Sequence, residues 1–375
     1  MKRRVRVTID LGALVRNYRR IVEHARGLEV LCVLKANAYG LGVGEYARAL
    51  VGAGCREFGV AEPHEALQLV RLFSKMGKRV SVQVLSSILP DEIHAMVKAG
   101  VVLPIVDYRT AQLIDAAAAK LGVMARVHFK IDTGMGRLGI RADDALDVIR
   151  SVMKLKHLKP EGIFSHCPMA YEPKNEFTKK QIASFAALVK KARDEGFVFK
   201  KVHIAASDAL NNFPEATRAP FTMIRTGINL HGSFDPNGRK VLKVEPVLAF
   251  TTRVAQVRDL PAGTTLGYGR TWKLDKPAKI ATISAGYADG LPLQLTNRGF
   301  VLIRGIRCPI VGRISMDYTT VDATAVSDIK AGDDVICLGK SGDEMITPDD
   351  WAEMKGTHAY DILCSFGTRV KREIG

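Results

Sequence analysis

Residues 101–131 read VVLPIVDYRTAQLIDAAAAKLGVMARVHFKI, in which two apolar runs flank an amphipathic stretch. The runs at 101–106 and 125–131 are short and mostly apolar, which is typical of buried strands. Between them, residues 108–122 repeat apolar side chains at three- and four-residue spacing, which indicates a helix. The segment therefore predicts a strand–helix–strand unit, the building block of α/β folds with parallel sheets.

The same alternation extends over the first two thirds of the chain. Residues 90–100 and 177–196 also have helical spacing, and six more runs resemble strands: 30–35, 57–60, 80–85, 161–165, 201–205 and 223–229. Eight strands alternating with helices over about 200 residues predict a (β/α)8 TIM-type barrel that spans residues 1–236. A doubly wound sheet stays open at this point, because alternation alone does not show closure.

The pattern changes near residue 236. Residues 236–269 and 279–290 look like strands broken by Gly and Pro turns, and the runs around 300–324 and 333–340 look similar. We therefore predict that residues 237–375 form a mainly β second domain.

Composition narrows the class of protein. The 375 residues are 47% hydrophobic and 25% charged, a balance typical of globular domains. Asp10 and Arg16 interrupt the N-terminal apolar region, so we expect no secretory signal, and no run is long enough for a transmembrane helix. The six cysteines contain no CxxC pair, which favours a cytoplasmic location. The +16 charge is spread along the chain, so we expect no nucleic-acid or membrane partner.

Polar residues gather at the predicted carboxyl ends of the barrel strands, where barrel enzymes place their chemistry. They are Lys35, Lys130, Asp132, His166, His203, Ser207, Arg225 and Gly227. Most are basic or neutral, whereas a metal enzyme needs acidic and histidine ligands at several ends, so we predict no metal. HExxH, GxSxG and Walker A motifs are also missing, which weighs against metalloproteases, serine hydrolases and nucleotide motors.

Lys35 closes an apolar run and precedes ANAYGLGVG. A lysine at the end of a buried strand is costly unless it is paired or used. Burial lowers its pKa and makes it nucleophilic, as chemistry on a carbonyl cofactor requires. The alternative is a lysine whose amine reaches the surface along its flexible stem.

A formal GxGxxG pattern lies in KIDTGMGRLG, at Gly134, Gly136 and Gly139. An NAD site needs an acidic residue at the end of the next strand, about 20 residues on, and none is found there. We interpret the glycines as a tight loop that presents Arg137, whose guanidinium can bind a carboxylate through two hydrogen bonds. A plain surface turn is the alternative.

Taken together, these segments resemble the alanine racemase family, in the family's order and over nearly the whole chain. The matching segments are VLKANAYGLG (33–42), HFKIDTGMGRLG (128–139), SHCPMAYEP (165–173), VHIAASDAL (202–210), IRTGINLHG (224–232), LGYGRTW (266–272), SAGYADGLP (284–292), VGRISMDYTTVD (311–322) and AYDILCSFGTRVKR (359–372).

The resemblance implies an enzyme that interconverts L- and D-alanine with pyridoxal 5'-phosphate (PLP), supplying D-alanine for peptidoglycan. Lys35 corresponds to the lysine that carries PLP, and Tyr268 to the opposing acid/base. The other implied cofactor contacts are Tyr39, His166, His203, Ser207, Arg225, Gly227, Ile228 and Tyr360. The implied substrate-side residues are Arg137, Lys130, Tyr287, Met316 and Asp317, with Lys130 matching a lysine often found carbamylated.

The resemblance also implies a homodimer in which Tyr268, Tyr287 and Met316 face the partner's cofactor. Two groups on opposite faces of Cα suit racemisation, because the proton must be able to leave and return on either face. Arg225 matches the arginine at the pyridine nitrogen of PLP. Arginine can only donate hydrogen bonds, so it keeps this nitrogen unprotonated and favours racemisation over transamination.

The sequence departs from the family pattern at four positions near the predicted site. Leu41 replaces a histidine, Ala206 an asparagine and Ser315 a cysteine, and Asn229 begins Asn-Leu-His-Gly where Ala-Met/Leu-Tyr-Gly is common. Serine or a broader substrate range therefore stays open. Three other classes stay as alternatives: a PLP barrel decarboxylase of basic amino acids, a small PLP-binding homeostasis barrel and, on charge alone, a nucleic-acid-binding protein.

Overall fold

Eight parallel strands form the first part of the structure, a computed structural model that describes residues 3–375. They are β2 (Glu29–Val33), β3 (Glu57–Val60), β4 (Ser81–Val84), β5 (Leu103–Ile105), β6 (Ala125–Asp132), β8 (Leu158–Phe164), β9 (Lys201–His203) and β10 (Met223–Thr226). Each overlaps a predicted strand. A two-residue strand, β7 (Ile140–Arg141), pairs with the end of β6.

Backbone hydrogen bonds close these strands into a ring. Pairing runs in the orders β10-β2-β3-β4 and β5-β6-β8-β9. A parallel bridge between Gln83 and Val102 joins β4 to the start of the β5 region. On the other side, Thr222 N donates to Val202 O at 2.9 Å, which joins β10 to β9. The predicted barrel is therefore confirmed, and the doubly wound alternative is wrong.

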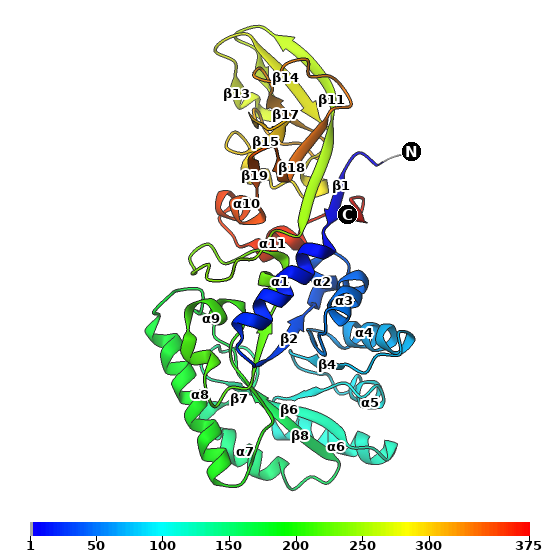
Figure 1. Cartoon of the computed structure of the whole chain (residues 1–375), viewed down its shortest axis with the longest axis vertical. Coiled ribbons are helices and arrows are strands. Elements are labelled where there is room, and N and C mark those ends of the chain that lie inside the picture. Colours follow the sequence, from blue (N-terminus) through cyan, green and yellow to red (C-terminus); the bar gives the residue numbers. More distant parts are fainter. Residues whose placement is uncertain (1–2) are drawn as a thin grey trace.

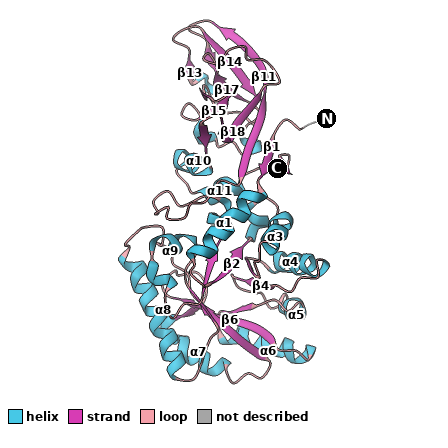
Figure 2. Ribbon diagram, in the orientation of Figure 1, coloured by secondary structure: helices cyan, strands magenta, loops and turns pink. Residues whose placement is uncertain are grey.

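Helices cover the outside of the barrel (Figures 1 and 2). They are α1 (Leu11–His24), α3 (Val43–Gly52), α4 (Pro63–Lys75), α5 (Ile93–Lys98), α6 (Tyr108–Leu121), α7 (Ala145–Val152), α8 (Glu176–Asp194) and α9 (Ser207–Asn212). In α6, the Asp107 carboxylate caps the first turn, Gly122 ends the helix in a left-handed conformation, and the buried face follows the predicted spacing. Among the helices of residues 3–375, none has the length and apolarity that a membrane span requires.

The second part is mainly β, as predicted. Its strands are β11 (Leu248–Leu260), β12 (Thr265–Leu266), β13 (Trp272–Lys273), β14 (Ala278–Ile283), β15 (Phe300–Ile303), β16 (Ile306–Pro309), β17 (Thr319–Asp322), β18 (Asp334–Ser341), β19 (Glu344–Ile346) and β20 (Lys371–Ile374). Two helices, α10 (Pro348–Lys355) and α11 (Ala359–Cys364), lie between this sheet and the barrel (Figure 1).

The first strand of the chain belongs to the second part, which the sequence pattern does not predict. β1 (Arg6–Ile9) pairs antiparallel with β11 and parallel with β20. The helix that follows it, α1, packs on the barrel next to α3 (Figure 1). The chain therefore passes between the two parts close to its N-terminus and again near residue 247.

Side chains of the barrel strands alternate between two environments. Val30 and Cys32 of β2 belong to the large core under the helices. Leu31 and Val33 form a separate buried cluster with Met223, packed against Leu85. Because neighbouring residues of a strand point to opposite faces, this second cluster fills the inside of the barrel. His128 and Lys130 of β6, His203 of β9 and Arg225 of β10 are buried residues that share that inward face.

Candidate active site

Lys35 lies just beyond β2, in a backbone turn that the sequence pattern does not reveal. The predicted strand 30–35 is too long, because β2 ends at Val33 and Lys35 begins α2 (Lys35–Tyr39). The four residues from Ala36 to Tyr39 all have φ between 52° and 56°, which makes a left-handed turn. Each non-glycine residue in this conformation costs about 1–2 kcal/mol, so surrounding contacts must hold the turn.

Hydrogen bonds at both ends of the turn provide that support. The Glu65 carboxylate accepts from the Ala36 amide and from two backbone amides at the start of α4. The Asn37 side chain accepts from Val43 N at 2.9 Å, and Gly40 N donates to Ala36 O at 2.7 Å. Lys35 and Tyr39 are therefore fixed at opposite ends of one rigid turn.

The Lys35 amine lies among other cations at the mouth of the barrel. Partial desolvation and the nearby Arg137 guanidinium lower the pKa of Lys35 from its usual value. A lower pKa increases the neutral, nucleophilic fraction of the amine near neutral pH. The same side chain is exposed in the single chain, so a ligand can reach it.

Arg225 is buried inside the barrel mouth without a carboxylate partner among residues 3–375. Its guanidinium donates to His203 Nδ1 at 2.8 Å and to the Ser165 and Ile204 carbonyls at 2.8 and 3.0 Å. His166 Nδ1 lies 3.4 Å away. Burial lowers the pKa of Arg225 to about 10, which still leaves it a cation at neutral pH.

The two histidines beside Arg225 are neutral. Burial and the Arg225 charge lower the pKa of His166 to about 3 and that of His203 well below its usual value. The ring of Phe164 stacks on His203 with centroids 5.0 Å apart, and Lys130 and Arg225 both lie over the same ring. The site is thus a cationic arginine surrounded by neutral acceptors and one aromatic face.

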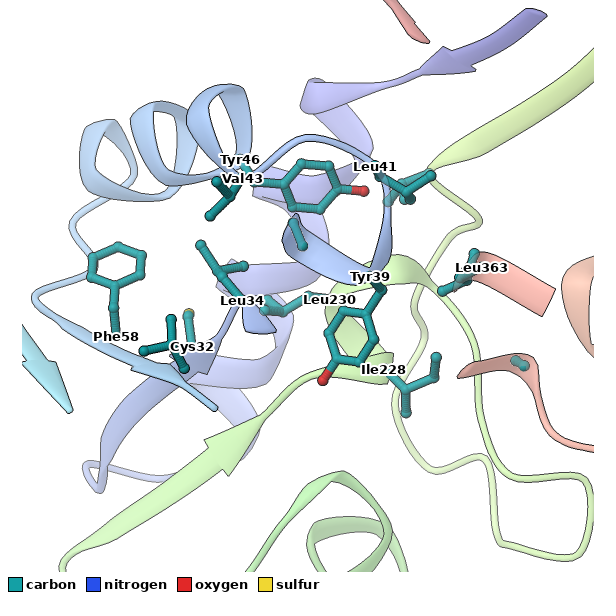
Figure 3. Packing of buried hydrophobic residues seen from close by; sticks show 14 of the residues in the cluster. Cys32, Leu34, Tyr39, Leu41, Val43, Tyr46, Phe58, Ile228, Leu230 and Leu363 are labelled. Carbon is teal, nitrogen blue, oxygen red and sulfur yellow. The ribbon is translucent and has the colours of Figure 1, made fainter. Parts of the chain in front are cut away.

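A second group of predicted cofactor residues gathers beside the left-handed turn. The Ser207 hydroxyl accepts from Gly227 N at 3.1 Å. A Cβ on Gly227 would lie 2.2 Å from the Tyr39 hydroxyl, so only glycine fits here. The Tyr39 and Tyr360 rings lie 5.6 Å apart, and Figure 3 shows Tyr39 beside Ile228, the first residue of the short helix Ile228–His231. Burial raises the pKa of both tyrosines, which keeps them neutral donors.

The glycine-rich loop that carries Arg137 is organised by Asp132. Its carboxylate accepts from the backbone amides of residues 134, 135, 136 and 137 at 2.7–3.2 Å. Desolvation opposes ionisation, but these four bonds lower the pKa of Asp132 overall. Sequence reasoning placed Asp132 at a strand end without this role. The loop leaves Arg137 exposed at the barrel mouth.

Lys130 lies below this loop on β6. Its amine donates to Leu85 O at 2.7 Å and to Ser86 O at 3.2 Å. Burial and the charges of Arg137 and Arg225 lower the pKa of Lys130 to about 8. The structure therefore brings Lys35, Lys130, Arg137 and Arg225 together at one end of the barrel.

The predicted residues of the second part do not all join this group. Tyr268 begins the short helix Tyr268–Arg270 and is 73% exposed. Figure 1 places β13, which begins at Trp272, at the end of the second part farthest from α2. Tyr287 and Met316 are also exposed, at 45% and 52%. Among residues 3–375 of one chain, no hydrogen bond or ring contact joins Tyr268 to Lys35.

Arg369 holds the segments of Tyr287 and Met316 together, and sequence reasoning missed it. Its guanidinium binds both carboxylate oxygens of buried Asp289, at 2.7 and 2.8 Å, and reaches Asp317 at 2.6 Å. The only sequence signal was its place inside the matched segment 359–372. Arg369 thus fixes two turns that carry predicted substrate-side residues.

The four departures from the family pattern are accommodated locally. Leu41 is buried in the hydrophobic core (Figure 3). Ala206 precedes α9 and gives it no side-chain cap. Asn229 is buried and donates to a carbonyl in its own turn at 3.0 Å. Ser315 donates to Tyr318 O at 2.7 Å.

Comparison with known families agrees with this geometry. The model of the alanine racemase N-terminal domain matches residues 9–235, and that of the alanine racemase C-terminal domain matches residues 247–374. The chain belongs to the alanine racemase family.

Relatives and solved structures in this family resemble the chain over nearly its whole length. The alanine racemase of Halothermothrix orenii is 34% identical, covering 97% of this chain and 95% of that protein. The one of Geobacter sulfurreducens is 37% identical, covering 97% and 95%. The alanine racemase structure from Streptomyces lavendulae has a TM-score of 0.91 at 30% identity, covering 100% and 98%. That from Bartonella henselae, with covalently bound pyridoxal phosphate, has a TM-score of 0.87 at 30% identity, covering 99% of each chain.

Proposed function

We propose that this protein is an alanine racemase that binds PLP on Lys35, interconverts L- and D-alanine and supplies D-alanine for peptidoglycan. The observation that carries the proposal is that Lys35 and Arg225 both lie at the barrel mouth, and that the buried Arg225 has no carboxylate partner among residues 3–375. Family membership and the bound pyridoxal phosphate of the Bartonella henselae structure support the same cofactor.

The residues present fit the three reactive parts of PLP. Lys35 offers an amine for the aldehyde, and Arg225 offers N–H donors for the ring nitrogen. Ser207, Gly227 and Tyr360 lie together beside Tyr39, where neutral donors can hold a phosphate and the missing side chain of Gly227 leaves room for the Tyr39 hydroxyl. When bound, PLP withdraws electrons from the amino acid's Cα, so that its proton becomes removable.

The charges of the mouth suit an amino-acid substrate. Arg137 stands exposed on a loop fixed by four backbone hydrogen bonds, ready to bind the substrate carboxylate. Lys130, below it, adds a second positive charge. Arg225 donates hydrogen bonds but cannot accept one, so it would hold the ring nitrogen of bound PLP unprotonated and limit electron withdrawal by the ring. This favours racemisation over transamination.

Two measurements test the assignment. Purified protein given PLP should racemise L-alanine in a chiral assay run against all L-amino acids. Borohydride treatment should fix the cofactor to the peptide that contains Lys35, and Lys35→Ala should abolish the label while Lys130→Ala keeps it. A label on Lys130 contradicts the proposal. So does a chiral assay in which other amino acids are racemised but alanine and serine are not.

We further propose that two chains share their active sites in a homodimer. Tyr268, the predicted second acid/base, is 73% exposed, and the nearby strand β13 lies at the end of the second part farthest from α2. A two-fold dimer can place Tyr268 over the neighbour's barrel mouth, because an isologous interface repeats each contact twice. Tyr287, Met316 and Asp317, on turns fixed by Arg369, would accompany it.

Complementation between inactive variants tests the shared site. Lys35→Ala and Tyr268→Ala homodimers should each be nearly inactive. In a mixed dimer, one site carries both changes and the other carries neither. Random mixing gives about half mixed dimers, so activity should recover to about a quarter of wild type. No recovery, with mixed dimers verified by mass, means that each chain builds its own site.

The location we propose is the cytoplasm. All six cysteines are free, and five of them are buried. Free thiols in this number are typical of a reducing compartment. Alkylation of intact cells followed by mass mapping checks the thiol state, and paired cysteines would contradict this location.

A further inference from the structure

A line of buried nitrogen atoms extends from Arg225 into the barrel. Arg225 contacts His203 Nδ1 at 2.8 Å, and His203 Nε2 lies 3.3 Å from His128 Nδ1. The three residues come from β10, β9 and β6, and each is at most 5% exposed. His128 lies at the far end of the line from the barrel mouth. It begins the matched segment 128–139, but neither that segment nor the proposed function gives it a role.

The direction of the hydrogen bonds along this line follows from the chemistry of arginine. A guanidinium only donates, so His203 Nδ1 must carry a lone pair. Neutral His203 then holds its proton on Nε2, which points at His128 Nδ1. His128 must accept through Nδ1, and its own proton lies on Nε2, a buried atom without a hydrogen-bond partner. One proton arrangement satisfies both contacts.

The backbone around His128 is shaped for this ring. A Cβ on Gly162, in the neighbouring strand β8, would lie 2.6 Å from the backbone oxygen of Lys201, 2.7 Å from His128 Cε1 and 2.8 Å from His128 Nδ1. Any other residue at 162 would clash both with strand β9 and with the imidazole of His128. The glycine therefore keeps the space that the hydrogen bond needs.

The electrostatic surroundings keep both imidazoles neutral. Burial is the largest effect, and nearby cations add to it, so the pKa of each histidine lies well below its usual value. The charged groups that face the pair are all cations: Arg225 on β10, Lys201 on β9 and Arg126 on β6. Lys201 and Arg126 have acidic partners of their own, Glu57 and Glu161. Many functional histidines donate their second ring N–H to a carboxylate. His203 donates instead to the neutral imidazole of His128.

We propose that His128 is a positioning residue that fixes the tautomer of His203 and, through it, the orientation of Arg225. Its meaning for catalysis rests on the proposed function, because Arg225 is the predicted partner of the cofactor's ring nitrogen. A neutral acceptor at position 128 holds the proton of His203 on Nε2 without supplying a negative charge that would offset the Arg225 cation.

Three substitutions of His128 separate the effect of a hydrogen-bond acceptor from the effect of a negative charge. Asparagine places an oxygen where Nδ1 lies, so His128→Asn keeps a neutral acceptor. His128→Asp has the same shape with a negative charge, and His128→Leu removes the acceptor. Circular dichroism and size-exclusion chromatography check folding, and the Asn/Asp pair stays informative if the Leu variant fails to fold.

The first measurement is independent of catalysis. In ¹⁵N-histidine spectra of the protein without PLP, the His203 signals, assigned by their loss in His203→Asn, should show a lone pair on Nδ1 and a proton on Nε2. His128→Asn should keep this pattern. His128→Asp should raise the pKa of His203 so that it gains a second proton as pH falls from 8 to 5. A proton on Nδ1 in wild type, or identical titrations of the Asn and Asp variants, overturns the proposal.

The second measurement is PLP affinity. Loss of one buried acceptor should weaken binding about tenfold in His128→Leu, with His128→Asn restoring it to within about twofold of wild type. Equal affinity of His128→Leu and wild type overturns the positioning role. A protein that binds PLP and shows the expected tautomer but racemises nothing would refute the proposed function and leave the role of His128 standing.

Discussion

Two glycines of one loop give a matched test of how the protein presents Arg137. Gly139 has φ +125°, and a Cβ there would lie 2.9 Å from Lys130 O and 3.0 Å from Asp132 N, both backbone atoms. Gly136 has φ +69°, and a Cβ there meets nothing within 4 Å. The two positions differ in steric space and in how far their backbone lies from the left-handed region that alanine can enter.

The expected costs follow from these geometries. Gly136→Ala should destabilise the protein by about 1 kcal/mol, the cost of one alanine in the left-handed region. Gly139→Ala has two costs. The strained φ costs about 1–3 kcal/mol. The clash of the new Cβ with backbone atoms costs about 1–3 kcal/mol more. We therefore expect a loss of about 4 kcal/mol for Gly139→Ala, about 3 kcal/mol more than for its neighbour.

Urea unfolding and steady-state kinetics test both consequences. Gly139→Ala should raise the KM for alanine about tenfold or more, because the loop can relieve the clash only by moving Arg137. Gly136→Ala should keep the KM within about threefold of wild type. Equal free energies of unfolding for the two variants, or a wild-type KM in Gly139→Ala, would refute the account of this loop.

Three further predictions concern other parts of the molecule. Arg369→Gln leaves the buried Asp289 carboxylate without its cation and should lower the free energy of unfolding by about 2 kcal/mol. Arg369→Lys should lie closer to wild type, and equal losses of stability in the two variants would contradict this. Burial and Asp235 raise the pKa of Asp208 to about 6, so the folded state holds an extra proton and loses stability as pH rises from about 4 to 7. Asp208→Asn should flatten this dependence in urea unfolding, and an unchanged slope argues against it. Tyr268→Phe should stop proton removal from one alanine enantiomer, while exchange from the other partly survives. Deuterium wash-in measured from each pure enantiomer tests this, and an equal loss for both would indicate that Tyr268 has only a structural role.

The fold was largely predictable because its signals are local. Strand length and helical spacing depend on neighbouring residues, and they located all eight barrel strands. β1 was missed because its four residues pair with residues of β11 and β20 that lie 239–245 and 365 positions away in the chain. Closure of the ring also depends on distant pairs such as Gln83 with Val102, which no spacing pattern reveals. The left-handed turn after Lys35 contains alanine and asparagine rather than glycine until Gly40, so the sequence hides it.

The candidate site likewise contains residues that the sequence reveals and residues that it does not. Lys35, Arg225 and the position of Asp132 could be predicted because strand ends are visible in sequence. Glu65 and the role of Asp132 could not, since both carboxylates accept from backbone amides, which leave no side-chain pattern. His128 was within reach of the sequence: it lies two residues before Lys130 on one strand, so both must face the inside of the barrel.

Two observations at the barrel mouth share an electrostatic contribution. Burial is the largest cause of the lowered pKa values of Lys35 and Lys130, and nearby guanidinium groups lower them further: Arg137 acts on both lysines and Arg225 on Lys130. The acids that oppose this effect, Glu65 at Lys35 and Asp132 at Lys130, also accept hydrogen bonds from backbone amides, and the pKa of each lysine is still lowered overall. The resulting positive field attracts a carboxylate or phosphate and, before either arrives, raises the neutral fraction of the Lys35 amine. Binding an anion and preparing a nucleophile are thus two effects of one arrangement of charges.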